Sequence, residues 1–171
     1  KQCKNTLCYD GQNFFDDDPP VYAEVDGTGA VTQQSNLTKG SSAGKPAFYI
    51  LDTTKAIKPF IWQERTSPEI EAKFDPSKSD AVFMEDTYIW GMFRSSSNMW
   101  GLWQLAHRVE DSELTEDVLM GVLAKMKSLK GDGGKLLNIR PNVLLVPPSL
   151  EHTAKKLVEA DIINGTSNVL K

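Results

Sequence analysis

Acidic side chains and aromatic rings share the stretch from Trp62 to Trp103, and this combination is the first candidate for chemistry. Two carboxylates that flank a glycosidic bond can hydrolyse it, one as acid and one as base or nucleophile. The alternative is that these carboxylates are solvated or paired with Lys and Arg, which we expect because they fall in polar segments beside an aromatic core. The residues considered for such a pair are Glu64, Glu69, Glu71, Glu85 and Asp86.

A second acidic group, Asp16-Asp17-Asp18 with Asp10 and Asn13 nearby, has oxygen ligands of the kind that Ca²⁺ prefers. Calcium loops, however, alternate their ligands, turn at a glycine and end in a bidentate glutamate, and this spacing is absent. We therefore interpret the group as a solvated acidic loop.

Phosphate, zinc and acyl-transfer chemistry have weaker candidates. The segment 40–46, Gly-Ser-Ser-Ala-Gly-Lys-Pro, has one residue too few between its glycines for a phosphate-binding loop, and proline replaces the Ser or Thr that would hold magnesium. His107 and His152 have no Cys or carboxylate at metal-ligand spacing, and no G-x-S-x-G elbow occurs. We expect His152 on the surface and His107 half-buried beside tryptophans. The sequence thus assigns no catalytic, cofactor-binding or metal residue and predicts a protein that is not an enzyme.

The elements that would carry these residues fall into three segments, 1–46, 47–110 and 111–171. Residues 1–46 are rich in turn signals, with Pro19-Pro20 excluding a helix, and predict short strands and ordered loops. In 47–110 we expect strands at 48–51 and 57–63, the second at a sheet edge because of Pro59, and then an exposed loop over 64–79. Residues 81–109 predict two strands with a turn at 95–98, or alternatively a helix over 85–93.

The last segment has the clearest periodicity. Thr115 can cap a helix whose first turn is acidic and whose apolar residues recur at helical spacing up to Leu129. Residues 143–146 predict a strand covered on both faces, because they are all apolar. A further amphipathic helix begins after Pro147. We expect an α+β fold with a mixed sheet flanked by helices, in one compact unit that is truncated at both ends.

The composition of the chain argues against two classes of partner, nucleic acids and membranes. The 171 residues carry 19 basic and 23 acidic side chains, a net charge of −4, which argues against a dedicated nucleic-acid-binding protein. No apolar run approaches the length of a membrane span, so no membrane partner is expected. Cys3 and Cys8 are too few and too close together for a disulfide framework, and we interpret them as reduced thiols of a protein made in the cytoplasm.

Six motifs follow one another across nearly the whole chain and carry a resemblance to a known family. They are Cys8-Tyr9-Asp10-Gly11-Gln12-Asn13-Phe14-Phe15, Asp26-Gly27-Thr28-Gly29, Leu51-Asp52-Thr53 with Lys58-Pro59-Phe60-Ile61-Trp62-Gln63-Glu64-Arg65, Gly101-Leu102-Trp103-Gln104-Leu105-Ala106, Gly131-Asp132-Gly133-Gly134-Lys135, and Ile139-Arg140-Pro141 leading into Leu145-Val146-Pro147-Pro148-Ser149-Leu150. In this order they resemble the major head (capsid) proteins of Mu-like phages and prophages.

The resemblance implies a piece of the Hong Kong 97-type capsid fold. Residues 143–158 look like the centre of the axial domain in 111–171, while 47–110 looks like part of the peripheral domain, with 1–46 packed on the core. Residues 83–106 are similar to a segment that other capsid proteins carry near their C-termini, which implies a permuted order. An N-terminal arm, an extended loop and a long spine helix are expected upstream, and a final strand segment downstream.

The function that the resemblance implies is that of a structural subunit of an icosahedral phage head, which associates with copies of itself into pentamers and hexamers around the genome. No cofactor is implied. Further implied partners are a scaffold protein, a head-maturation protease and non-specifically packaged DNA. The subunit would be made and assembled in the bacterial cytoplasm and would end up in the virion capsid.

Subunit contacts of such a shell are rich in Trp, Tyr, Phe, Met and Arg. The candidate contact residues are Trp62, Trp90, Arg94, Trp100, Trp103 and Arg108, although an aromatic core would use the same types and we favour the core for most tryptophans. Two other functions stay open: a bacterial nanocompartment shell protein of the same fold, and a carbohydrate-active enzyme or sugar-binding module built on 62–103.

Overall fold

The computed structural model describes residues 7–8, 11–75, 77, 80–85, 87–160, 162–163 and 166–167. The sequence interpretations of Cys3, Asp10 and Asp86 lie outside these residues. The chain divides into two compact units, a larger one made of Lys1–Pro59 with Trp100–Lys171 and a smaller one made of Phe60–Met99. Each unit is described by itself.

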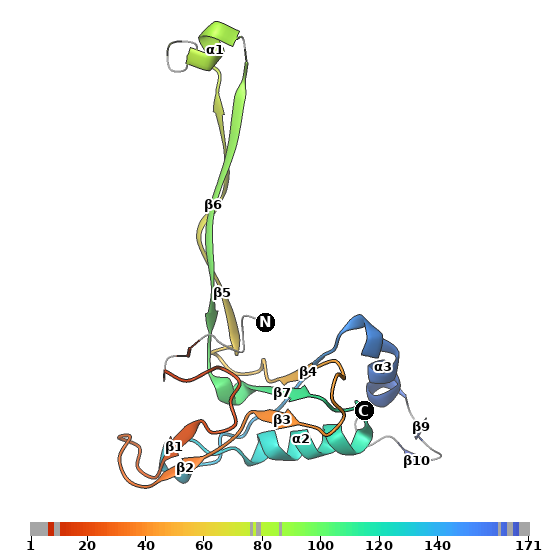
Figure 1. Cartoon of the computed structure of the whole chain (residues 1–171). Coiled ribbons are helices and arrows are strands. Elements are labelled where there is room, and N and C mark those ends of the chain that lie inside the picture. The colour runs from red at the N-terminus through yellow and green to blue at the C-terminus, as the bar shows by residue number, and fades with distance from the viewer. Residues whose placement is uncertain are drawn as a thin grey trace. The chain divides into compact units, whose positions relative to one another are not determined.

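A four-stranded mixed sheet forms the centre of the larger unit, in the order β3 (Leu37–Lys39), β7 (Ala106–Glu110), β4 (Phe48–Leu51) and β8 (Val143–Leu145) (Figure 1). β3 runs parallel to β7, whereas β4 is antiparallel to both β7 and β8. The two central strands, β7 and β4, contribute most of the buried residues of the sheet.

Two helices pack against this sheet and close the main hydrophobic core. In α2 (Glu116–Ser128), the Thr115 side chain accepts a hydrogen bond from the backbone N–H of Val118 at 3.4 Å, as the capping prediction expected. α3 (Glu151–Glu159) follows the short 3₁₀ turn Pro148–Leu150. The predicted mixed sheet flanked by helices is confirmed. Fully buried members of this core include Phe48, Val109, Val122, Met126 and Ile139.

The amino-terminal segment is tied to the core by one buried amide. Asn36 is fully buried, and its side chain donates to the carbonyl oxygens of Phe14 at 2.7 Å and Trp103 at 3.2 Å while accepting from the N–H of Asp16 at 3.0 Å. The rest of the segment forms a small antiparallel pair, β1 (Pro20–Tyr22) with β2 (Val31–Gln33). The short strands expected in 1–46 are therefore present.

Three ionisable side chains are buried in the described part of the larger unit: His107, Asp52 and Glu110. His107 is 1% exposed rather than half-buried, its Nε2 lies 2.8 Å from Thr38 Oγ1, and burial together with the nearby charge of Lys125 lowers its pKa to about 4. Asp52 accepts from both the N–H and the hydroxyl of Thr54 and from the N–H of Arg140, which ties the loop before β8 to the end of β4. Although burial opposes it, these hydrogen bonds lower the pKa of Asp52.

The smaller unit is a two-stranded ribbon of β5 (Phe60–Lys73) and β6 (Ile89–Trp100), which run in opposite directions and are joined through the short helix α1 (Asp80–Glu85) (Figure 1). At the base of the ribbon the N–H of Gly101 donates to the carbonyl of Pro59 at 2.9 Å. A Cβ at position 101 would lie 2.0 Å from the carbonyl oxygen of Lys58, so only glycine fits this approach.

Three sequence predictions fail in this ribbon. The loop expected over 64–79 is strand up to Lys73, and Pro68 is tolerated because each strand of a two-stranded ribbon has one unpaired edge. Ser95 to Asn98 continues β6 instead of turning, and no helix covers 85–93. The chain reverses through α1, which begins directly after the segment 64–79 that was predicted as a loop.

The strand at 143–146 also differs from its prediction. β8 occurs, but it lies at the edge of the sheet, where Val143 is 37% and Leu145 is 52% exposed. The larger unit therefore leaves one face of this apolar strand open, rather than covering both.

The sequence predicts a single compact unit, whereas the structure divides into two. The boundaries between the two units fall at residues 59/60 and 99/100, inside the predicted segment 47–110. The difference arises because β4 and β7, at the two ends of that segment, pair with each other and leave the intervening residues to form the ribbon. The remaining short elements are the 3₁₀ turns Trp103–Leu105 and Asp132–Gly134 and the pair β9 (Ile162–Ile163) with β10 (Thr166–Ser167).

Within the described residues, no helix combines the length and apolarity required to cross a bilayer.

Candidate assembly surface

The ribbon has two chemically different faces, because successive side chains of a strand point to opposite sides. In β5 the even positions carry residues such as Trp62, Ile70 and, just after the strand, Phe74, while the odd positions from 65 to 73 carry Arg, Ser, Glu, Glu and Lys. Across the ribbon, Arg94 contacts Trp62 and Glu64, and Phe74 contacts Tyr88 and Trp90, all of them at even positions. The even positions of β5 and β6 thus share one face.

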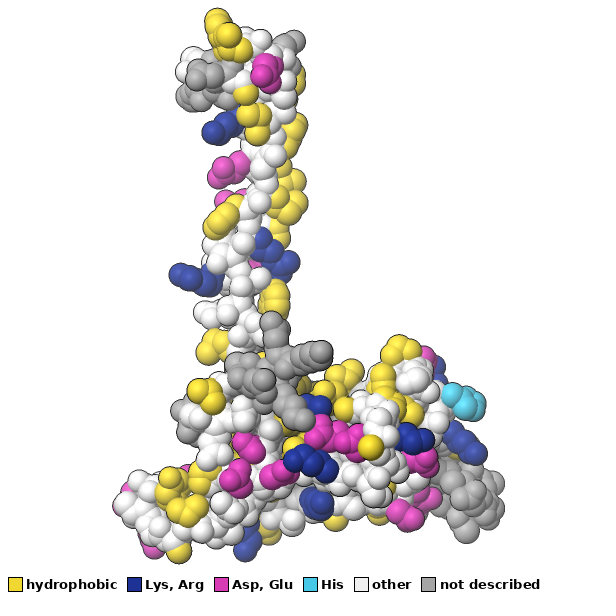
Figure 2. Space-filling model, in the orientation of Figure 1, with side chains coloured by type: hydrophobic (Ala, Val, Ile, Leu, Met, Phe, Trp, Pro, Cys, Tyr) yellow, Lys and Arg dark blue, Asp and Glu magenta, His cyan; other side chains and the backbone are white. Residues whose placement is uncertain are grey.

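Large apolar side chains are exposed along the ribbon from its base to its tip (Figure 2). On the even face Trp62 is 62%, Trp90 65% and Met92 70% exposed. A two-stranded ribbon has no second layer to cover such side chains, and exposed apolar patches of this kind mark interaction sites. The other large apolar side chains exposed on the ribbon are Ile70, Phe74, Phe83, Met84, Tyr88, Ile89, Phe93 and Met99.

Two side-chain clusters order the even face. Near the base, the guanidinium of Arg94 lies 5.6 Å from the centre of the Trp62 ring, and its Nε is 3.5 Å from Glu64 Oε1. Nearer the tip, the ring of Phe74 packs edge-on against Trp90 at 5.0 Å between centroids and lies 5.5 Å from Tyr88. These contacts hold bulky side chains in fixed positions while leaving their outer surfaces to solvent.

The six residues predicted as subunit contacts separate into two groups. Trp62, Trp90 and Arg94 lie exposed on the ribbon. In the larger unit, Trp103 is only 2% exposed, and Trp100 is half-buried with its ring 5.3 Å from Phe14. Arg108 is also in the larger unit, opposite Tyr49 across β7 and β4 and paired with Glu110 at 2.8 Å.

Sequence reasoning missed the apolar surface of the later part of β5. Ile70 and Phe74 were not singled out, because residues 64–79 were interpreted as an exposed loop. The alternation of apolar and charged residues from 60 to 74 was the signal that could have identified β5. A continuous strand of this length then predicts an exposed face, since no described element packs on the two-stranded sheet that it forms with β6.

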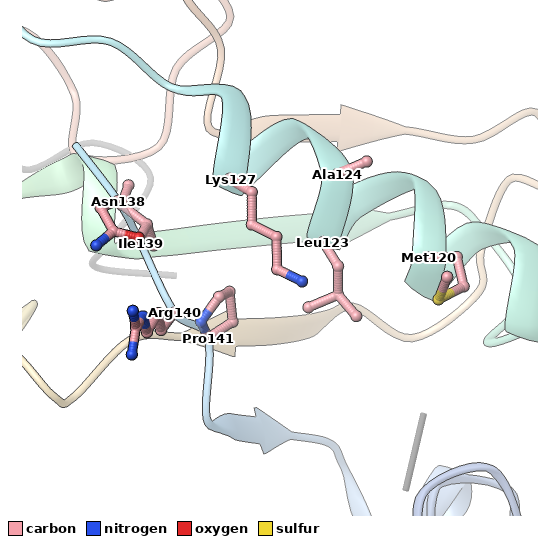
Figure 3. Close-up of a pocket in the computed structure, with 8 residues that line it drawn as sticks. All are labelled: Met120, Leu123, Ala124, Lys127, Asn138, Ile139, Arg140 and Pro141. Carbon is pink, nitrogen blue, oxygen red and sulfur yellow. The ribbon is translucent and has the colours of Figure 1, made fainter. Parts of the chain in front are cut away.

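A groove in the larger unit is a second open apolar surface (Figure 3). It has a volume of about 690 Å³ and lies between one face of α2 and the loop that precedes β8. The residues that line it are Met120, Leu123, Ala124, Lys127, Asn138, Ile139, Arg140 and Pro141.

Those candidates for catalysis and metal binding that lie within the described ranges do not converge on a site. Glu69 and Glu71 occupy odd positions of β5, on the opposite face from Glu64, which contacts Arg94 instead of a second carboxylate. Among the described residues, no cluster of three His, Cys, Asp or Glu side chains is placed to hold a metal ion. His152 is exposed, as expected.

Comparison with known proteins agrees with this picture of a protein built around surfaces. The family model described as "Mu-like prophage major head subunit gpT" matches residues 1–171. The chain belongs to this family. Within it, the chain is 41% identical over 163 residues to the major capsid protein of Escherichia phage Mu, an alignment that covers 95% of the chain and 53% of that protein. It is 42% identical over 159 residues to the Mu-like prophage FluMu major head subunit of Haemophilus influenzae, covering 92% of the chain and 51% of the relative.

The fold of this Mu-like head subunit chain is that of phage capsid proteins. A chain from the procapsid of bacteriophage JBD30 superimposes with a TM-score of 0.83 at 41% identity, covering 98% of the chain and 56% of the solved one. The resemblance deduced from the six motifs is thereby confirmed, as is the capsid fold. The chain spans about half the length of the relatives it matches.

Proposed function

We propose that the protein to which this chain belongs is a structural subunit of a phage or prophage head, and that it acts by associating with copies of itself into capsomers and a closed shell. The observation that carries the proposal is the match to the head-subunit family over residues 1–171. The geometry of the ribbon is consistent with this role, because it exposes large apolar and aromatic side chains that no other described residues cover.

The finer parts of the proposal follow from the same role. The even face of the ribbon, with Trp62, Trp90 and Arg94, forms part of the contact between subunits. The protein performs no enzymatic step, it is made in the host cytoplasm, and it meets a scaffold protein, a maturation protease and packaged DNA during head formation. Pentamers and hexamers are the expected assemblies, because heterologous contacts close into rings.

The test is electron microscopy of the full-length gene product expressed in bacteria. We expect closed shells or flat capsomer sheets, with subunits in rings of five and six. A product that stays monomeric at high concentration under head-assembly conditions contradicts the proposal. Shells filled with a co-purifying enzyme would instead identify a nanocompartment, and binding or hydrolysis of glycans without particles would identify a carbohydrate-active protein.

A further inference from the structure

The groove of the larger unit is built from a second apolar stripe of α2. Leu119, Val122 and Met126 face the core and are buried, whereas Met120, Leu123 and Ala124 lie on the adjoining face and line the groove. Met120 is 42% exposed. A helix that is apolar on both of these faces needs cover on both, and within the described residues only one of them is covered.

The charge of the groove is one-sided. Lys127 and Arg140 are the only charged residues among those that line it, and both are positive. In Figure 3, the Lys127 side chain extends from α2 on the same side as Leu123, and Arg140 comes from the strand-like loop that faces it. The groove therefore favours an apolar occupant that carries negative charge.

The tip of the ribbon has the complementary composition. In α1, Val82 is buried, but the next two side chains, Phe83 and Met84, are 72% and 77% exposed. Residues 74–88 contain four acidic residues and one lysine. The helix itself contains no basic residue. The tip thus presents two large apolar side chains within an acidic segment.

We propose that the tip of one copy, through Phe83 and Met84, docks into the groove between α2 and residues 138–141 of a second copy. The apolar side chains would cover Met120 and Leu123, while the acidic residues of the tip, such as Glu85, would face Lys127 and Arg140. The groove volume of about 690 Å³ lies within the usual range of ligand-binding pockets and is large enough for both side chains. This inference rests on the proposed function, since it names the partner surface for self-association.

The length of the ribbon favours a second copy over the same chain. The 14 residues of β5 span about 46 Å at roughly 3.3 Å per residue. A compact unit of about 130 residues has a diameter of only about 36 Å, taken from the usual scaling of the radius of gyration. A paired ribbon is therefore longer than such a unit is wide, which favours a groove on a second copy as the docking site of the tip.

Such a contact is heterologous, because it joins two different surfaces of identical molecules. Each copy offers one tip and one groove, so contacts repeat from copy to copy and either close into a ring or continue as a sheet. This is the type of contact that a shell requires.

The first test uses two single-cysteine variants of the full-length gene product, each in a background in which every native cysteine, including Cys3 and Cys8, is replaced by serine. One carries Met84→Cys at the tip and the other Met120→Cys in the groove. Both are co-expressed, assembled and mildly oxidised. We expect a disulfide-linked heterodimer on a denaturing gel. Val25→Cys replaces Met120→Cys as the matched control, because Val25 is 75% exposed on the same unit but far in sequence from the groove, and it should give at least about tenfold less product.

The second test reverses the charges. Glu85→Lys, and separately Arg140→Glu, should each reduce the heterodimer yield about tenfold at unchanged melting temperature, because each brings like charges together. The combination of both should restore most of the yield.

The outcomes separate this inference from the proposed function. Shells that form normally without heterodimer, or with the same yield for the Val25 control, overturn the docking of tip into groove and leave the head-subunit function standing. A heterodimer yield that is unchanged by both Glu85→Lys and Arg140→Glu also overturns the docking of tip into groove. Absence of any particle or oligomer from the unmodified protein contradicts the function itself.

Discussion

The two units of the chain each contain the same trio of side chains, an arginine over an aromatic ring and beside a glutamate, in opposite surroundings. In the larger unit, Arg108 lies 5.9 Å from the centre of the Tyr49 ring and 2.8 Å from Glu110, and the two charged side chains are only 15% and 11% exposed. The trio follows from the register, since Tyr49 and Arg108 are directly opposite each other in β4 and β7.

In the ribbon, the equivalent trio is exposed to solvent. Arg94 lies 5.6 Å from the Trp62 ring and 3.5 Å from Glu64, and its side chain and that of the glutamate are 46% and 39% exposed. The same chemistry therefore stabilises the fold in one unit and lies open to a partner in the other. At this trio the larger unit completes its contacts within the chain, while the ribbon holds its trio in position without covering it.

The largest expected difference between the units is for tryptophan. Trp103→Ala should lower the free energy of unfolding by about 3 to 5 kcal/mol, because the side chain is 2% exposed and its loss leaves a cavity. Trp90→Ala should cost less than about 1 kcal/mol, since it loses mainly the edge-on contact with Phe74. Urea unfolding of both variants measures this. Equal losses would show that the ribbon is as well packed as the core, and only Trp90→Ala should impair assembly at unchanged melting temperature.

Removal of the two arginines tests the comparison of the trios. Arg108→Ala should destabilise the protein by about 3 kcal/mol, because it removes the ion pair with the mostly buried carboxylate of Glu110. Arg94→Ala should change stability by less than about 1 kcal/mol, as is usual for exposed pairs. Thermal unfolding with calorimetry, at low and at high salt, measures both. A similar cost for the two variants would contradict the distinction between the units.

The larger unit should also be sensitive to acid, through His107. Its pKa is about 4 in the folded protein and about 6.5 when unfolded, so between these values the unfolded state binds a proton that the folded state does not. Stability should therefore rise by up to about 3 kcal/mol from pH 4 to pH 6.5. The depressed pKa of Asp52 acts in a different window, because its contribution is lost only as the pH falls below its ordinary 3.8.

The measurement is the urea midpoint between pH 4 and 6.5 for the native protein, for His107→Gln and for His152→Gln. His107→Gln should flatten the pH dependence, and His152→Gln, which replaces an exposed histidine, should leave it unchanged. A slope that persists in His107→Gln would assign the effect to other groups.

The sequence predicted the larger unit better than the ribbon, and the reason is physical. Helix α2 could be located from its periodicity and its Thr115 cap, and β4 from a short apolar run, because a core requires apolar residues at regular spacing. The mixed order of the sheet could not be predicted, since β3 pairs with β7 across 71 positions and nothing local specifies that pairing.

The prediction of the ribbon failed because its strands do not contribute to a core that would impose regular apolar spacing. Its strands carry Pro68 and the polar run from Ser95 to Asn98, which favour loops when propensity is judged alone. Because neither face of the ribbon packs on a core, the alternation of apolar and polar residues that is usual for a strand is incomplete in β6. The candidate contact residues were predicted by type only, so Trp103 and Arg108, which the fold buries, could not be told apart from Trp62 and Arg94, which it exposes.

The smallest expected effect concerns two asparagines. Asn36→Ala should lower the free energy of unfolding by about 2 kcal/mol, because it removes three hydrogen bonds to buried or half-buried backbone groups. Asn98→Ala, on the exposed ribbon, should change it by less than about 0.5 kcal/mol. Because Asn36 joins the segment at Phe14 to the turn at Trp103, its loss should also speed proteolytic cleavage before residue 36, as read by mass spectrometry. If cleavage in that segment is unchanged while stability falls, the amide stabilises the sheet and does not anchor the amino-terminal segment.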